Sequence, residues 1–230
     1  TSGGKLLCSK ILRCGMWVVA FLQQYGFNIV IDWGLEAGFW NASLWQLEEL
    51  RVIQQAITRL VQVFAGRPIE NNLISVIRVN KSGIAESPQN TIRICNDFMN
   101  AAMPQVAFVH EFAHAWDYLN GGKFSNSLSD FRGNEPGPTA YGSGPGLGTW
   151  STNPRDDEWA ESFAAYVYPE YIAYLRTPGT TDFAQEQRWE LKLNQRPEYR
   201  NSPQRRPGLG QFHKAYVALQ IHGPFWPYVR

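Results

Sequence analysis

The sequence predicts an α+β fold, with a small mixed sheet and a long helix in the first half of the chain and mainly helices in the second half. Short β-rich segments occur only before the middle of the chain, whereas helical periodicity occurs throughout. The 230 residues suffice for one large domain or two small lobes. We therefore expect a single domain, 1–230, with an N-terminal lobe of about residues 1–120 and a C-terminal lobe of about residues 121–230.

The first predicted elements are a helix over residues 5–25 and a strand over the β-rich residues 27–33. A second helix is expected from Ser43, because Ser43 as the N-cap and Gln46 three residues later fit a capping box. Gly66 would end this helix. Its apolar residues recur at helical spacing and are expected to pack in the core; they are Leu44, Leu47, Leu50, Ile53, Ile57, Leu60, Val61 and Phe64.

Two further strands and a central helix follow. Residues 73–79 and residues 91–95 have the composition of strands, and the turn-rich residues 81–89 connect them. A helix is predicted next, because Pro104 suits a first turn and the positions up to residue 117 are mostly apolar. This pattern predicts a helix that is buried over most of its surface.

The second half begins with residues 120–154, a glycine-rich segment with little periodicity, for which we expect an irregular loop bordering a cleft. Pro154 then suits the first turn of a helix, which acidic residues stabilise and which ends or kinks near Pro169. Further helices are predicted over residues 183–193 and residues 212–219. Two histidines near the end of the chain are expected to be ordinary surface or core side chains: His213 and His222.

Charge and cysteine content exclude several classes of protein. The 21 basic residues nearly balance the 20 acidic ones, so nothing indicates a nucleic-acid or anionic-membrane partner. No C-x-x-C pair is present, so a structural zinc site is not expected. Cys8 and Cys14 would form a small disulfide or remain buried thiols, and Cys95 is the third cysteine. The apolar run at residues 16–22 is too short to span a membrane.

One motif in the central helix carries specific chemistry. His110 and His114 lie four residues apart, so a helix places them one above the other on the same face. Two imidazoles in this arrangement can bind one metal ion, and Glu111 can then take a proton from a water bound to that ion. This is the H-E-x-x-H pattern of zinc metallopeptidases. A buried helix needs partners for its polar side chains, and a metal is the simplest partner for two facing histidines.

The third zinc ligand distinguishes two plans, since a catalytic zinc takes three protein ligands and one water. One plan uses a histidine six residues after the second, but this position is Asn120 and the plan is therefore excluded. The other plan takes a glutamate from a later helix. Glu158 and Glu161 lie three residues apart on such a helix, and the pattern alone leaves both open.

Three short motifs occur in order along the middle of the chain. They are His-Glu-Phe-Ala-His-Ala-Trp-Asp at residues 110–117, Thr-Ala-Tyr-Gly at residues 139–142 and Glu-Ser-Phe-Ala at residues 161–164. Over about residues 104–168 the chain resembles the catalytic domain of anthrax lethal factor and the related Pro-Pro endopeptidases. The Mlc titration factor peptidases have similar H-E-F-A-H and E-x-F-A motifs. The resemblance implies a zincin-like metalloprotease fold of the gluzincin type.

The resemblance also implies a role for each matching residue. His110, His114 and Glu161 would bind one Zn²⁺ ion. Glu111 would be the general base, and Tyr141 would donate a hydrogen bond to the oxyanion. The chain would then be a single catalytic domain whose first lobe carries the two histidines and whose second lobe carries the third ligand.

Several of these roles have alternatives. In the related peptidases the tyrosine lies seven residues before the third ligand, whereas Tyr141 lies twenty residues before Glu161, with a glycine-rich stretch between them. Either an insertion loops out or Tyr141 is not the equivalent residue. Asp117 is expected either beside the ligands or as a helix-end carboxylate that bonds to the backbone or a nearby Arg. Glu158 is expected beside the metal, and Glu158 or Asp157 could replace Glu161 as the ligand.

The predicted function is that of a zinc-dependent endopeptidase, which hydrolyses peptide bonds through a glutamate-activated zinc-bound water. The alternatives are a catalytically inactive zincin-fold module, used for binding or as a toxin component, and a metallohydrolase with a non-peptide substrate. We expect a peptide or protein substrate and a monomer without nucleic acid or a membrane span. A secreted or extracytoplasmic location is expected from the aromatic-rich composition, a leader-like N-terminal run and the sequon at residues 41–43.

Overall fold

The chain divides into two compact units, Thr1–Leu119 and Asn120–Arg230, in a computed structural model. The predicted lobe boundary at about residue 120 lies next to this division, and the grouping of both units into one catalytic domain stays a prediction. The predicted helix over residues 5–25 falls almost entirely outside the described residues, as do Cys8 and Cys14. The described residues are 20, 29–31, 45–65, 74–142, 153–180, 182–197 and 208–223.

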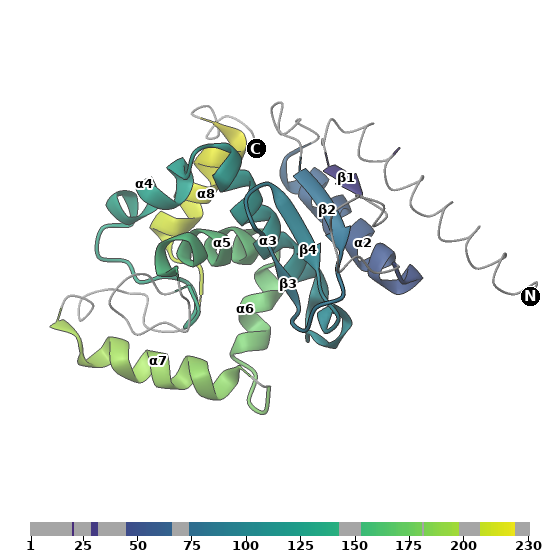
Figure 1. The fold of residues 1–230 in the computed structure, drawn as a ribbon. Coiled ribbons are helices and arrows are strands. Elements are labelled where there is room, and N and C mark those ends of the chain that lie inside the picture. The colour runs from purple at the N-terminus through teal and green to yellow at the C-terminus, as the bar shows by residue number, and fades with distance from the viewer. Residues whose placement is uncertain are drawn as a thin grey trace, which may run out of the picture. The chain divides into compact units, whose positions relative to one another are not determined.

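The first unit contains a four-stranded mixed sheet with the strand order β1-β2-β4-β3 (Figure 1). Strands β1, β2 and β4 are parallel, and β3 pairs with β4 in the antiparallel direction. In the centre of the sheet Val76 pairs with Ile92 and Arg78 with Ile94. The bounds are Ile29–Ile31 for β1, Ile74–Arg78 for β2, Ala85–Glu86 for β3 and Thr91–Ile94 for β4.

The predicted strands over residues 73–79 and 91–95 are confirmed as β2 and β4, and β1 falls within the strand predicted over residues 27–33. The turn-rich connection predicted at residues 81–89 is present, and it also contains β3, which was not predicted. A strand of two residues is too short to show alternation in sequence. An α+β fold with a mixed sheet is thus present.

Helix α2 spans Leu47–Val63, and its start differs from the prediction. Gln46, not Ser43, is the N-cap, and its backbone N–H donates to the side chain of Glu49 at 2.9 Å. The capping pair is therefore Gln46 with Glu49, a reciprocal arrangement that stabilises the first turn. The predicted apolar stripe is confirmed within the described residues by the buried side chains of Leu50, Ile53, Ile57, Leu60, Val61 and Phe64.

Helix α3 spans Pro104–Leu119 and follows a short 3₁₀ helix, η1, at Phe98–Asn100. It packs against α2, η1 and the strands β3 and β4. The predicted helix beginning at Pro104 is confirmed, and most of its surface is buried as expected. The sheet and α2 thus fix the orientation of the helix that carries the H-E-x-x-H motif.

The described part of the second unit consists of helices and their connections, in agreement with the predicted helical second half (Figure 1). Helix α5 has the most central position, because it packs against α4, α6 and α8. The loop predicted over residues 120–154 was partly wrong, since α4 occupies its first part. The bounds are Lys123–Arg132 for α4, Pro154–Val167 for α5, Pro169–Leu175 for α6, Phe183–Gln195 for α7 and Gln211–His222 for α8.

Helices α5, α7 and α8 correspond to predicted helices, whereas α6 was not predicted as a separate helix. Asn153 is the N-cap of α5 and Pro154 is its first residue. Helix α5 ends at Val167, just before Pro169, as expected. The final helix is longer than the predicted 212–219. Across the described residues, no helix is both long enough and apolar enough to cross a lipid bilayer.

Candidate metal centre

Aromatic and aliphatic packing fixes the rotation of α3 about its own axis. Phe112 and Ala113 are fully buried. Trp116 contacts Phe64, the C-cap residue of α2, with ring centroids 5.2 Å apart in an edge-to-face arrangement. Such packing leaves a helix one preferred orientation. The polar residues of the motif therefore project from α3 in set directions.

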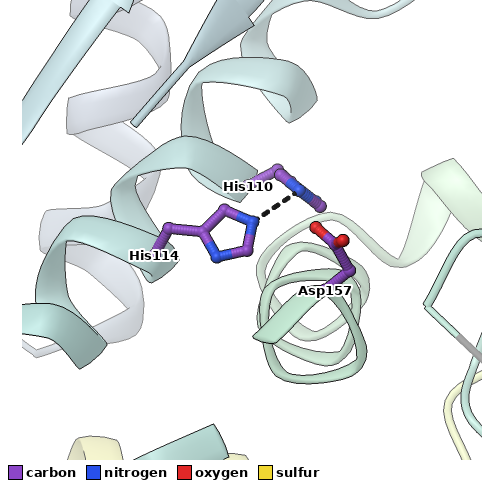
Figure 2. Close-up of side chains that lie close together, drawn as sticks. All are labelled: His110, His114 and Asp157. Carbon is purple, nitrogen blue, oxygen red and sulfur yellow. Dashed lines mark hydrogen bonds between the residues drawn. The ribbon is translucent and has the colours of Figure 1, made fainter. Parts of the chain in front are cut away.

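The two histidines of the motif lie side by side on α3 (Figure 2). Their Nε2 atoms are 3.0 Å apart, and the ring centroids are 4.7 Å apart at an interplanar angle of 77°. Two nitrogen ligands at ~2.0–2.1 Å from a tetrahedral ion lie roughly 3.3 Å apart. The observed separation is close to this spacing, so His110 and His114 fit the binding of one ion between their Nε2 atoms.

Glu111 and Asp117 complete the motif residues on α3. Glu111 is half-buried, and Asp117 is buried in the last turn. Burial raises the pKa of the Cys95 thiol, and the charge of Glu111 contributes to the same shift. The Glu111 carboxylate is therefore close enough to the end of β4 for its charge to act there. The role of Asp117, beside the ligands or at the helix end, stays a prediction.

Three acidic side chains of α5 are buried: Asp157, Glu158 and Glu161. Burial of a carboxylate is costly unless hydrogen bonds or a cation compensate for it. The partners of each carboxylate therefore indicate its purpose. Asp157 and Glu161 lie four residues apart and so share one face of the helix.

The Glu161 carboxylate is held by two hydroxyl groups. Thr139 Oγ1 donates to Glu161 Oε2 at 2.8 Å, and the Tyr171 hydroxyl donates to the same oxygen at 3.1 Å. Glu161 Oε1 takes no part in these two bonds. Hydrogen bonds of this kind orient metal-binding carboxylates in proteins.

The Thr139–Gly142 segment lies directly against α5, whereas the Tyr141 side chain is 42% exposed. A Cβ atom at Gly142 would come within 2.6 Å of both the Asp157 carbonyl oxygen and the Glu161 Cβ atom, so only glycine permits this approach. Tyr141 is thus next to a residue that touches Glu161, although it lies twenty residues earlier in the sequence. The role of Tyr141 as the oxyanion donor stays a prediction, and most of the stretch between Tyr141 and α5 lies outside the described residues.

Glu158 belongs to a different, buried network. It forms ion pairs with Arg132 and with His213 Nε2, the latter at 2.9 Å. His213 is fully buried, and its Nδ1 is 2.6 Å from Glu135. Burial alone would lower the pKa of His213, but the hydrogen bonds to Glu135 and Glu158 outweigh it and the pKa is raised. His213 is therefore a core histidine, as the sequence predicted.

Two further carboxyl groups, those of Asp182 and Glu186, lie close enough to Glu161 for its charge to act on them. The pKa of Glu186 on α7 is raised to about 8, first by burial and then by the charges of Glu161 and Asp182, while the N–H of Ala140 acts in the opposite direction. Burial and the Glu161 charge also raise the pKa of Asp182. At neutral pH Glu186 is therefore mostly protonated and adds little negative charge beside Glu161.

The chain thus contains side chains suited to a metal ion. Among the described residues, His110, His114 and Asp157 could hold one, because their ligand atoms lie within 4.8 Å of one another (Figure 2). This set contains Asp157, the alternative ligand, and not Glu161, so Glu161 as the third ligand stays a prediction. Three polar neighbours of Glu161 had no role in the sequence analysis: Thr139, Tyr171 and Glu186. Only Thr139 had a signal, because it belongs to the Thr-Ala-Tyr-Gly motif. The other two are separated from this motif along the chain, and no local pattern links them to it.

Comparison with models of protein families, with curated proteins and with solved structures finds no match to this chain. The resemblance to the lethal factor and Pro-Pro endopeptidase group therefore depends on the three short motifs. The zincin fold and the peptidase class that it implies stay predictions.

Proposed function

We propose that this protein is a zinc-dependent endopeptidase. The observation that carries the proposal is the pair of Nε2 atoms of His110 and His114, 3.0 Å apart on one helix, with Glu111 beside the first histidine. Two imidazoles at this separation suit one Zn²⁺ ion, and a glutamate next to them suits a general base. The buried carboxylates of α5 supply the third ligand that this site needs.

Each residue has a distinct part in the proposed reaction. His110 and His114 would hold the ion together with Glu161, and Asp157 is the alternative third ligand. A bound Zn²⁺ supplies an acidified water and polarises the scissile carbonyl. Glu111 accepts a proton and passes it to the leaving amine. The Tyr141 hydroxyl donates a hydrogen bond to the oxygen that gains negative charge.

The fold assignment and the partners belong to the same proposal. A small mixed sheet with an antiparallel edge strand, next to the helix with the H-E-x-x-H motif, is compatible with a zincin-like fold of the gluzincin type. The substrate would be a peptide or protein, and the enzyme would act as a monomer in a secreted or extracytoplasmic location.

Replacing the base while keeping the ligands tests the proposal. Glu111→Gln preserves size and hydrogen bonding but cannot accept a proton. We expect the variant to retain stoichiometric zinc and to cleave a peptide library at least about 10²–10⁴-fold more slowly than wild type. Zinc content is measured by elemental analysis and cleavage by mass spectrometry of the library. The control Glu48→Gln alters an exposed carboxylate of α2 and should behave as wild type.

Two results would contradict this assignment. Undiminished cleavage by Glu111→Gln would exclude Glu111 as the base. A wild-type protein that binds stoichiometric zinc but cleaves no member of the library would support an inactive zincin-fold module or a hydrolase of another substrate class.

A further inference from the structure

Two hydroxyl groups from separate segments meet at one oxygen of Glu161. Thr139 precedes the Tyr141 position, and Tyr171 lies on α6, which packs against α5. Both donate to Oε2, at 2.8 Å and 3.1 Å respectively. Thr139 is fully buried, Glu161 is 4% exposed and Tyr171 is half-buried.

Two donors on one carboxylate oxygen restrict the carboxylate strongly. A glutamate side chain has three rotatable bonds, and one hydrogen bond still permits rotation about the bond axis. A second donor to the same oxygen, from another direction, fixes the plane of the carboxylate and therefore the position of Oε1. Groups that orient a metal ligand in this way commonly contribute 10–100-fold to metal affinity.

The direction of both hydrogen bonds is fixed by their surroundings. The backbone N–H of Gly142 donates to Thr139 Oγ1 at 3.0 Å, so the threonine hydroxyl accepts from the loop and donates its own hydrogen to Glu161. The Tyr171 hydroxyl can only donate to the Glu161 carboxylate, because a phenol keeps its proton at neutral pH and a carboxylate only accepts. Both groups are therefore donors at neutral pH.

The same segment is also anchored to α7. Both carboxylate oxygens of Glu186 accept the backbone N–H of Ala140 at 2.9 Å. Ala140 directly follows Thr139, so these contacts hold the backbone next to the residue that bonds to Glu161. Tyr141 follows directly in this anchored segment.

We propose that Thr139 and Tyr171 are positioning residues that orient the Glu161 carboxylate as a metal ligand. This inference rests on the proposed zinc function, and it predicts that removing either hydroxyl weakens metal binding while the fold persists. The hydroxyls act on the metal only through Glu161, so neither residue is catalytic.

The test measures zinc affinity in the full chain. The variants Thr139→Val and Tyr171→Phe each remove one hydroxyl with little change in shape, and zinc dissociation constants are obtained by competition with a chelator. We expect an increase of about 10-fold or more in each, and a larger one when both are combined. Thr139→Ser restores a hydroxyl and should bind zinc nearly as wild type. Tyr174→Phe removes a hydroxyl from the same helix α6 and should leave the affinity within about twofold.

Circular dichroism and thermal unfolding of the metal-free variants separate positioning from folding, because a positioning role predicts nearly unchanged spectra. If Tyr171→Phe and Thr139→Val bind zinc as tightly as wild type, the inference is overturned and the proposed function survives. An equal loss in Tyr174→Phe or Thr139→Ser would also overturn it, because the effect would then not depend on these hydroxyls. A wild-type protein without zinc affinity would overturn the proposed function and this inference together.

Discussion

Three buried carboxylates of similar chemistry occupy one turn and a half of α5, and their partners distinguish them. Glu158 is paired with Arg132 and His213, whose positive charges compensate for its burial. Glu161 accepts two neutral hydroxyls, which orient the carboxylate but do not cancel its charge. At the scale of single residues, Glu158 is therefore a structural ion-pair partner, whereas the metal-ligand role of Glu161 belongs to the proposed function.

The His213 network predicts a pH-dependent stability. Because the pKa of His213 is raised from 6.5, its contribution is complete below that value and is lost as pH rises through the raised pKa. The pKa of Glu135 is lowered from 4.5 by hydrogen bonds from His213 that outweigh burial, so its contribution is complete above 4.5 and is lost as pH falls through the lowered pKa. The network should therefore stabilise the fold most between about pH 4.5 and 6.5.

The variant His213→Gln measures this contribution, since glutamine can form hydrogen bonds but carries no charge. The free energy of unfolding is measured with denaturant between pH 4 and 9. Near pH 6 it should be about 2 kcal/mol lower in the variant than in wild type, which is the scale of hydrogen bonds to charged groups. The deficit should decrease at alkaline pH. His222→Gln, on the same helix, serves as the control. A deficit that stays constant over the whole range would show that the charge of His213 does not contribute.

At the scale of elements, α5 allows the three carboxylates to be separated by experiment. We expect Glu161→Gln to raise the zinc dissociation constant at least about 100-fold, since a ligand is lost. Glu158→Gln should leave zinc affinity unchanged but destabilise the metal-free fold by about 3 kcal/mol, because Arg132 and His213 lose a buried partner. Asp157→Asn should change zinc affinity little. Chelator competition and denaturant unfolding provide the two measurements.

Other patterns of zinc affinity among these three variants would contradict the expected ligand. Loss of zinc in Asp157→Asn together with retention in Glu161→Gln would identify Asp157 as the third ligand and exclude Glu161. A loss of affinity in Glu158→Gln would show instead that the ion-pair network and the metal site compete for the same carboxylate.

Elements with a local signal were predictable from the sequence. Helix α3 shows apolar periodicity, and α5 shows an Asn-Pro start that local backbone preferences favour. Helix α4 shows no such stripe, because its buried positions are Ser125, Leu128 and Arg132. A periodicity analysis counts an arginine as polar, whereas Arg132 is buried with an ion pair to the distant Glu158 and hydrogen bonds to the carbonyls of Gly133 and Glu135.

The start of α2 illustrates the same limit on a smaller scale. Serine is preferred at N-caps, so sequence alone favoured Ser43 over Gln46. The Gln46–Glu49 pair supplies an equivalent reciprocal arrangement three residues later. A capping rule ranks single residues, whereas the packing of the following apolar stripe decides where the helix begins.

The candidate site was predictable where its residues are close in sequence. The histidine pair and Glu111 follow from one motif on one helix, whereas Thr139, Tyr171 and Glu186 come from three segments of the second unit. Their meeting depends on how α5, α6 and α7 pack, which no local pattern encodes. Sequence therefore identified candidate ligands, and the structure added the hydroxyl groups that bond to Glu161.

At the scale of the whole molecule, the proposed zinc function predicts that metal binding raises the stability of the fold. Zinc at 100 times its dissociation constant should raise the free energy of unfolding by about 2.7 kcal/mol, because only the folded state has the site. The increase should be visible as a higher midpoint of thermal unfolding and should be reversed by a chelator. His114→Ala in the first unit and Glu161→Gln in the second should each abolish it. Glu111→Gln should keep the full increase, because the proposal does not make Glu111 a ligand.

One result would contradict the proposed ligand set. The variants Glu161→Gln and Asp157→Asn, tested alone and combined, would keep the zinc-induced increase in stability, while His114→Ala would lose it. Neither carboxylate would then bind the ion.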